Sequence, residues 1–163
     1  MISLNRQCMK NKVAWSVLVI TGLTFSGCEA ITGKELARLA VNVVSTEGNI
    51  RSQETTLDLK AKDEVAIWSH MDMEYDGNVQ LRFQIQVLKD SVAIALIEVD
   101  PTEKSMTVGE VQTQFGGHMN WSFTGKNKVV TVDEDGRYTF RAILVASDTV
   151  GLKLNAAEVI LKQ

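Results

Sequence analysis

The stretch VQLRFQIQV, residues 79–87, decides the fold class of this chain. Its apolar side chains occupy every second position, and Gln or Arg fills the positions between them. Because successive side chains of a β-strand point to opposite faces, this alternation predicts a strand with one buried face and one solvated face. A strand of this kind needs a second layer to cover its apolar face.

Weaker strand signals lie on both sides of this stretch. They cover residues 55–60, 64–73, 91–99, 108–114, 120–124, 128–132, 137–147, 151–154 and 158–162. Turn residues separate them at Asp76-Gly77-Asn78, Lys89-Asp90, Asp100-Pro101, Gly116-Gly117, Gly125-Lys126-Asn127 and Asp135-Gly136. Short strands at intervals of about 8–12 residues predict an antiparallel sandwich or barrel, and the lack of alternating helical segments excludes a Rossmann-like sheet.

A motif near the C-terminus refines this architecture. Glu134, Gly136, Tyr138 and Phe140 follow one another at two-residue steps, a pattern that resembles the tyrosine corner of Greek-key sandwiches. The resemblance implies that the Tyr138 hydroxyl bonds to backbone upstream. Immunoglobulin-like domains carry Cys where this chain has Phe140. The stretch 64–162 is also similar to GOLD-type β-sandwiches, and both resemblances imply a Greek-key β-sandwich without implying a function.

The residues before the sandwich predict a helix and a linker. Thr32 and Glu35 form a capping box, and Leu36, Leu39, Ala40 and Val43 then recur at helical spacing, which predicts a short helix from about Ile31 to Val44. Residues 45–54 are polar and predict a linker. We therefore expect three segments: a signal peptide (1–27), a modified N-terminus with helix and linker (28–54), and a β-sandwich domain (55–163).

The N-terminal residues predict where in the cell the protein is located. A basic stretch with Arg6, Lys10 and Lys12 precedes an apolar run of 13 residues, Val13 to Phe25. Phe25-Ser26-Gly27-Cys28 then resembles the lipobox of bacterial lipoproteins, which implies a diacylglyceryl thioether on Cys28, cleavage before it and attachment to an envelope membrane. Glu29 in place of Asp after the Cys favours the outer membrane.

Two other interpretations of this segment remain open. A transmembrane anchor is disfavoured because 13 residues span only about 20 Å as a helix, less than the roughly 30 Å of a hydrocarbon core. The other alternative is a plain secretory signal that is cut elsewhere.

Charge and cysteine content restrict the partners of the mature chain. Loss of the signal leaves 14 basic and 20 acidic side chains, a net charge of −6, which disfavours nucleic-acid binding. Cys8 leaves with the signal and Cys28 carries lipid, so no disulfide is expected. Attachment to the membrane is then the work of the lipid.

No catalytic or metal motif stands out, and we expect no cofactor. Asp72, Glu74 and Asp76 partly match a calcium loop, but Phe83 occupies the twelfth position where Glu is required, so we interpret them as an acidic turn. Asp133-Glu134-Asp135-Gly136 is interpreted in the same way. His70 and His118 are the only histidines, and their separation does not predict a zinc site. A nucleophile elbow and a phosphate loop are both missing.

Three aromatic residues, Trp68, Tyr75 and Trp121, are candidates for facing a ligand. Trp68 alternates with Ile67 and Met71, so it is exposed or at a sheet junction if those residues face the core. A Trp that fills the gap between the sheets is the favoured alternative.

Three functions are compatible with these residues. The leading hypothesis is a non-enzymatic, lipid-anchored envelope protein whose sandwich binds a protein partner, and the alternatives are a carbohydrate-binding module and an envelope enzyme. An exposed Trp68–Tyr75 pair would favour a glycan, whereas a bare apolar edge strand would favour a protein. An enzyme would require a cleft that holds carboxylates of raised pKa.

Overall fold

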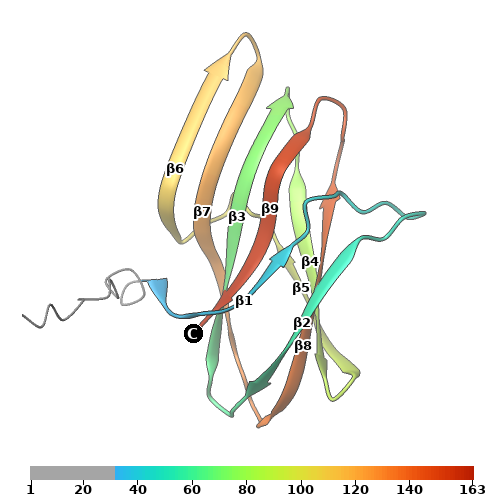
Figure 1. Cartoon of the computed structure of the whole chain (residues 1–163), viewed down its shortest axis with the longest axis vertical. Helices are drawn as coiled ribbons and strands as arrows, with labels where there is room; N and C mark the ends of the chain where they lie inside the picture. Colours follow the sequence, from blue (N-terminus) through green and yellow to red (C-terminus); the bar gives the residue numbers. More distant parts are fainter. Residues whose placement is uncertain (1–31) are drawn as a thin grey trace, which may run out of the picture.

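The computed structural model describes residues 32–163, which form two antiparallel sheets (Figure 1). The first sheet has the order β1-β9-β3-β7-β6, and the second has the order β2-β8-β4-β5. The strands are β1 (Glu35–Ala40), β2 (Ser52–Leu59), β3 (Glu64–Asp76), β4 (Leu81–Lys89), β5 (Val92–Val99), β6 (Met106–Phe115), β7 (His118–Thr131), β8 (Gly136–Ala146) and β9 (Lys153–Lys162). The predicted mainly-β sandwich is confirmed.

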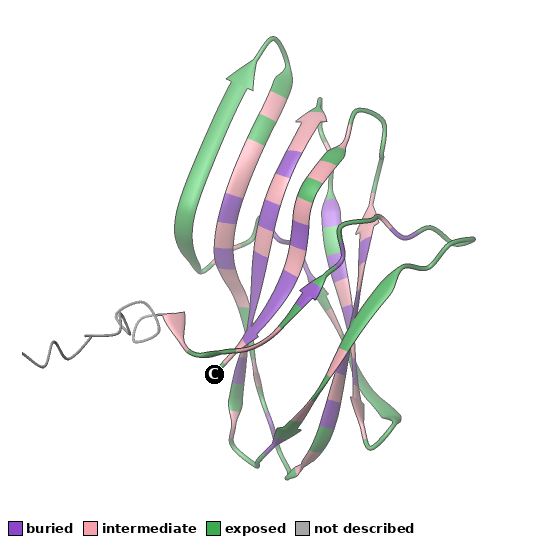
Figure 2. Cartoon of the chain, viewed as in Figure 1, coloured by how far each residue is buried: buried purple, intermediate pink, exposed green. Residues whose placement is uncertain are grey.

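The core lies between the two sheets and follows the alternation of the sequence. Leu81, Phe83, Ile85 and Val87 of β4 are buried, while Arg82 between them is exposed. β3 shows the same alternation in the opposite sheet, and Figure 2 shows the resulting bands of buried residues along both sheets. Each large apolar side chain that is fully buried contributes about 1.5–3 kcal/mol of transfer free energy.

Strand pairing is nested along the chain. β1 pairs with β9, β2 with β8, β3 with β7 and β4 with β5. The pairs β3–β9 and β4–β8 join these sets into the two sheets. β6 lies outside the nested set, because it pairs only with β7 at the end of the first sheet. In Figure 1 the β6–β7 hairpin projects at the top of the molecule.

The turn that leads into β8 has the predicted hydrogen bond. Tyr138 is only 5% exposed, and its hydroxyl donates to the backbone carbonyl of Glu134 at an O–O distance of 2.8 Å. Lys89 of β4 pairs with the Glu134 carboxylate and lies over the Tyr138 ring. The expectation that the Tyr138 hydroxyl bonds to the upstream backbone is confirmed.

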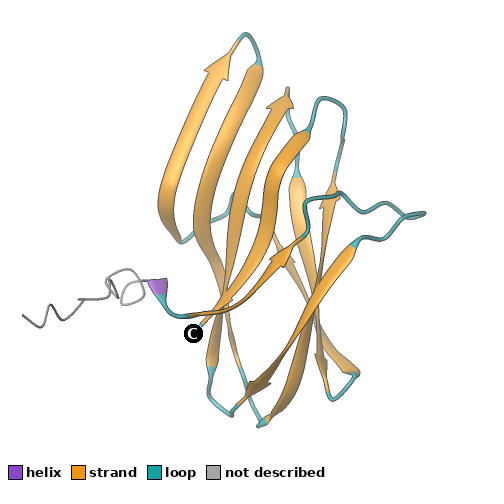
Figure 3. Cartoon of the chain, viewed as in Figure 1, coloured by secondary structure: helices purple, strands orange, loops and turns teal. Residues whose placement is uncertain are grey.

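The helix predicted from Ile31 to Val44 is wrong for residues 35–40. Residues 35–40 form strand β1, which pairs with β9 (Figure 3). Leu39 and Val41 alternate into the core, whereas Val43 of the expected helical face is exposed. An isolated helix of this length is marginal, so pairing with a distant strand determines the structure here.

The expected linker is packed against the second sheet. Ser45 is buried, and its Oγ accepts a hydrogen bond of 2.9 Å from the backbone N–H of Arg51. Val44 also forms a bridge with Leu144 of β8. The boundary predicted at Thr55 lies inside β2, so the sandwich includes residues upstream of it.

The turn predicted at Gly125-Lys126-Asn127 is also wrong, because these residues lie inside the long strand β7. Gly125 allows the side chain of Lys104 to pack against the backbone of β7, because a Cβ at this position would lie 2.4 Å from that side chain. The two short strands predicted on either side of the glycine are therefore one. The strands predicted at 151–154 and 158–162 likewise belong to the single strand β9.

Candidate binding surface on strands β5 and β6

The predicted lipidation site, Cys28, lies outside the described residues. Within residues 32–163, no helix is long and apolar enough to cross a bilayer.

Trp68 is buried, but outside the core. It is 1% exposed and alternates with the inward-facing Ile67 and Ser69, so it faces the outer side of β3. The ammonium of Lys162 on β9 lies 4.7 Å from the centroid of its ring. The Trp68 Nε1 atom has no hydrogen-bond partner among the described residues. A buried N–H without a hydrogen-bond partner costs about 1–3 kcal/mol of stability. Such groups are therefore unusual in folded domains.

Tyr75 and Trp121 lie on the inner face of the first sheet, half-buried on the neighbouring strands β3 and β7. The Trp121 Nε1–H donates to Glu110 at 2.8 Å, and its ring lies 4.8 Å from that of Phe123. Burial raises the pKa of the Tyr75 hydroxyl. Since Trp68 faces the other side of the sheet, the three candidate aromatics do not form one surface, and an exposed Trp68–Tyr75 pair does not exist.

The acidic residues of the partial calcium match lie on one strand. Asp72, Glu74 and Asp76 share the outer face of β3, where Glu74 pairs with Lys153 at 2.7 Å and Asp76 contacts His118 at 2.9 Å. The hydrogen bond from Lys153 holds the pKa of Glu74 below its usual value. Across residues 32–163, no cluster of three or more His, Cys, Asp or Glu is arranged to hold a metal ion.

β5 forms a bare apolar edge of the second sheet. Val92, Ile94 and Leu96 are all more than half exposed, and Leu96 is 65% exposed. The side of β5 away from β4 has no strand partner among the described residues, so its backbone N–H and C=O groups are free to pair. Glu98 is the only charged residue of the strand.

β6 forms a second bare apolar edge, at the end of the first sheet. Met106, Val108, Val111 and Phe115 are exposed, with Phe115 at 91%, and Figure 2 shows exposure along the whole strand. Their pairing residues on β7 belong to the outer face. A bulge between Val108 and Val111, with Gly109 at φ +65°, shifts the register so that all four side chains share this face.

An apolar cleft of about 410 Å³ lies between the sheets beside β5. Ile94 and Ile97 line it from β5, Val130 lines it from β7, and Tyr138 and Phe140 line it from β8. β6 pairs with β7 only between His118 and Lys126, so no described strand pairs with the rest of that edge of β7 at this opening. The cleft can therefore receive an apolar side chain from a molecule that docks on β5.

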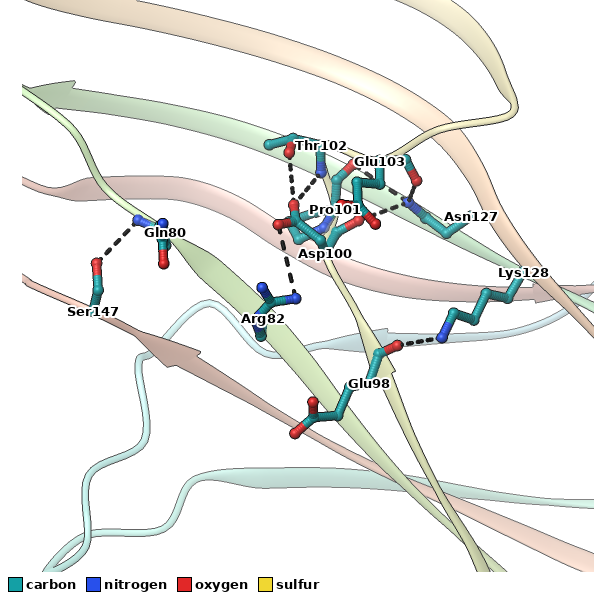
Figure 4. A network of polar contacts seen from close by, with 10 residues as sticks. All are labelled: Gln80, Arg82, Glu98, Asp100, Pro101, Thr102, Glu103, Asn127, Lys128 and Ser147. Atoms are coloured by element: carbon teal, nitrogen blue, oxygen red, sulfur yellow. Dashed lines mark hydrogen bonds and ion pairs between the residues drawn. The ribbon is translucent and has the colours of Figure 1, made fainter.

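A polar network fixes the crossover between the two edges (Figure 4). The Asn127 Nδ2 donates to three backbone carbonyls of the β5–β6 connection, those of Asp100, Pro101 and Glu103, at 2.8–3.4 Å. Its Oδ1 accepts a hydrogen bond of 2.7 Å from the buried hydroxyl of Ser69. One core-facing amide thus holds the connection that carries the chain from β5 to β6.

Lys104 fixes the base of the β6 edge. Its ammonium lies 3.9 Å from the centroid of the Phe123 ring, 5.0 Å from that of Trp121, and 2.8 Å from the Glu110 carboxylate. Hydrogen bonds from Lys104 and then from Trp121 hold the pKa of Glu110 below its usual value. This contact turns the only charged residue of β6 toward the inside, which leaves the outer row of the strand without a charge.

Sequence reasoning missed this surface. The run from Val92 to Ile97 is almost continuously apolar, which is typical of a buried strand, and nothing in it indicates a position at an edge. No known protein family and no curated protein sequence matches this chain.

Proposed function

We propose that this protein is a non-enzymatic bacterial envelope protein, anchored by a lipid on Cys28, whose sandwich binds a protein partner through the edges of β5 and β6. The lipobox resemblance of residues 25–28 supports the anchor and the envelope location, with the outer membrane favoured by Glu29. The exposed apolar edges support the partner.

The observation that carries the proposal is the contrast between the two sides of the sandwich. The edge strands β1 and β2 carry charges, such as Arg38 and Asp58, which protect a sheet from adding strands. β5 and β6 have neither Lys, Arg nor Pro, and they expose seven large apolar side chains. Such an edge suits an extended segment of another protein, since main-chain hydrogen bonds give affinity and alternate side chains give specificity.

The alternative functions have less support. A glycan platform lacks its aromatic pair, because Trp68 is buried and Tyr75 faces the opposite side of β3. The carboxylates whose pKa departs from the usual value, those of Glu74, Glu110 and Glu134, have lowered values, whereas a general acid needs a raised one. The net charge of −6 in the mature chain disfavours nucleic acid.

We also infer that the sandwich belongs to the Greek-key class. Nested pairing of β1 with β9, β2 with β8, β3 with β7 and β4 with β5 is the pairing order of a jelly roll, which consists of two Greek keys. The Tyr138 hydrogen bond supports the same class. In this arrangement β6 is an additional strand, which fits a role in binding.

Affinity capture from native envelopes tests the proposed function. The acylated protein is compared with Val111→Lys on β6, Leu96→Lys on β5, and Gln53→Lys on the charged β2 edge as the matched control. We expect the two apolar-edge variants to recover at least about tenfold less of the same partner, a loss of about 1.4 kcal/mol. Equal recovery by Val111→Lys, Leu96→Lys and the control would refute the edge as the binding surface.

A further inference from the structure

The outer face of the first sheet holds a groove of about 480 Å³ around Trp68. We call it the Trp68 groove. It is separate from the β5 cleft and from the exposed row of β6, apart from Met106 at its rim. Lys62, Lys126 and Lys162 line it, together with Asp63 and Glu64.

The groove contains hydrogen-bond donors without acceptors. None of its three lysines forms an ion pair with a described residue, a state that Lys60 and Lys128 outside the groove share. The buried Trp68 Nε1–H is the fourth donor without a partner. Three ammonium groups around one groove suit a ligand with several anionic oxygens, because charge-assisted hydrogen bonds to such oxygens are strong.

The groove also offers a place for a positive charge. The Glu64 carboxylate has no ion pair among the described residues, while Asp63 accepts a hydrogen bond of 2.9 Å from the backbone N–H of Lys60. The side chains that line the groove thus include three ammonium groups and two carboxylates. A ligand that carries a phosphate and a neighbouring ammonium complements both kinds of group.

The position of the groove indicates where such a ligand comes from. Thr32, the first described residue, lines the groove, and the described chain ends at the same place in Figure 1. Only four residue steps separate Thr32 from Cys28, so the chain between them spans at most about 14 Å. If Cys28 carries the anchor, as the proposed function requires, the groove lies within reach of the lipid headgroups.

We propose that the Trp68 groove binds a phosphoethanolamine-type headgroup supplied by the bilayer that holds the anchor. The phosphate oxygens accept hydrogen bonds from the groove lysines and from the Trp68 indole, and the headgroup ammonium pairs with Glu64. Lys162, which lies over the indole ring, turns toward the phosphate and gives it access to the Nε1–H. The bound headgroup holds the Trp68 groove, beside the first described residues, toward the membrane.

Nuclear magnetic resonance of the indole N–H groups tests the proposal. The full acylated protein, labelled with ¹⁵N-Trp and held in neutral detergent, is titrated with dihexanoyl phosphatidylethanolamine. The Trp68 cross-peak is expected to shift and saturate. The Trp121 cross-peak stays in place, because its N–H already donates to Glu110, and it reports that the fold is intact. A Trp68 cross-peak that does not move would overturn the proposal.

Paired variants identify the groups that bind. Lys126→Gln combined with Lys162→Gln is expected to weaken binding at least about tenfold, whereas Lys60→Gln combined with Lys128→Gln, outside the groove, leaves it within about twofold. Equal weakening by the two pairs would contradict the assignment. The titration is done in detergent, without the protein partner and without a bilayer, so its failure is distinguishable from failure of the proposed function.

Soluble ligands distinguish the source. O-phosphoethanolamine and inorganic phosphate are expected to bind more weakly than the lipid, and dihexanoyl phosphatidylcholine, which has no ammonium N–H, more weakly than phosphatidylethanolamine. Inorganic phosphate that bound as tightly as phosphatidylethanolamine would overturn the bilayer as the source.

Discussion

Removal of the Tyr138 hydroxyl tests what stabilises the connection between β7 and β8. In Tyr138→Phe the ring keeps its packing, but the Glu134 carbonyl loses the donor that lies 2.8 Å away. The hydroxyl is part-buried, so water only partly replaces it. A stranded acceptor of this kind costs about 1–3 kcal/mol, and we expect the free energy of unfolding to fall by that amount.

Urea denaturation of residues 29–163, produced without signal or lipid, measures this loss. Small domains lose about 1–3 kcal/mol of stability per molar urea, so the midpoint is expected to fall by about 0.5–1.5 M with an unchanged slope. Tyr75→Phe is the matched control. Its hydroxyl forms no hydrogen bond that the structure describes, and a change within about 0.5 kcal/mol is expected.

A midpoint for Tyr138→Phe equal to that of Tyr75→Phe would refute the reasoning. It would mean that the Tyr138 hydroxyl is well solvated, and that its bond to the Glu134 carbonyl contributes nothing to the connection between β7 and β8. The Greek-key proposal would then lose one of its two supports.

Three further predictions concern the anchor, the acidic strand face and the glycine of β7. Cys28→Ser is expected to abolish labelling of the protein with an alkyne fatty acid in growing cells, and label that persisted would exclude Cys28 as the acylated residue. The thermal midpoint of unfolding is expected to be the same in millimolar calcium and in chelator. A bound calcium ion would stabilise the fold by about 2.7 kcal/mol at a hundredfold excess over its dissociation constant. A rise of the midpoint with calcium that disappeared in Asp76→Asn would therefore show a real site. Gly125→Ala places a Cβ 2.4 Å from the side chain of Lys104, and we expect the free energy of unfolding, measured in urea, to fall by about 1–3 kcal/mol. Gly48→Ala is the control, because a Cβ there has no atom within 4 Å. An equal loss of stability in both variants would contradict the packing argument.

The features that the sequence could predict depend on local pattern. The alternation of residues 79–87 depends only on the period of a strand, and it fixed the buried face of β4. The spacing of Glu134, Gly136 and Tyr138 similarly predicted a hydrogen bond over four residues. Both features involve residues close together in the chain, for which spacing alone determines geometry.

The features that it could not predict depend on distant contacts. Residues 35–40 fit helical spacing, but pairing with β9, more than 110 residues away, decides for a strand. The sequence favoured Trp68 in the gap between the sheets, whereas the structure buries it on the outer side of β3, where Lys162 extends over its ring. Gly125 indicated a turn, yet its role is to admit the side chain of Lys104 from another segment.

The exposure of β5 and β6 has the same origin. The apolar run of β5 is typical of a buried strand, and only the strand order of each sheet shows that β5 and β6 lie at edges. The candidate binding surface on β5 and β6 could therefore be identified only from the fold.

Photo-crosslinking in living cells tests the central claim most directly. Benzoylphenylalanine replaces Phe115, which is 91% exposed on β6, or Val150, which is 79% exposed outside both edges. Binding through the apolar edge predicts a discrete crosslinked protein adduct of the acylated chain from position 115 and none of the same mass from position 150. Adducts of equal yield from both positions, or none from position 115, would contradict the claim that this edge binds a protein partner.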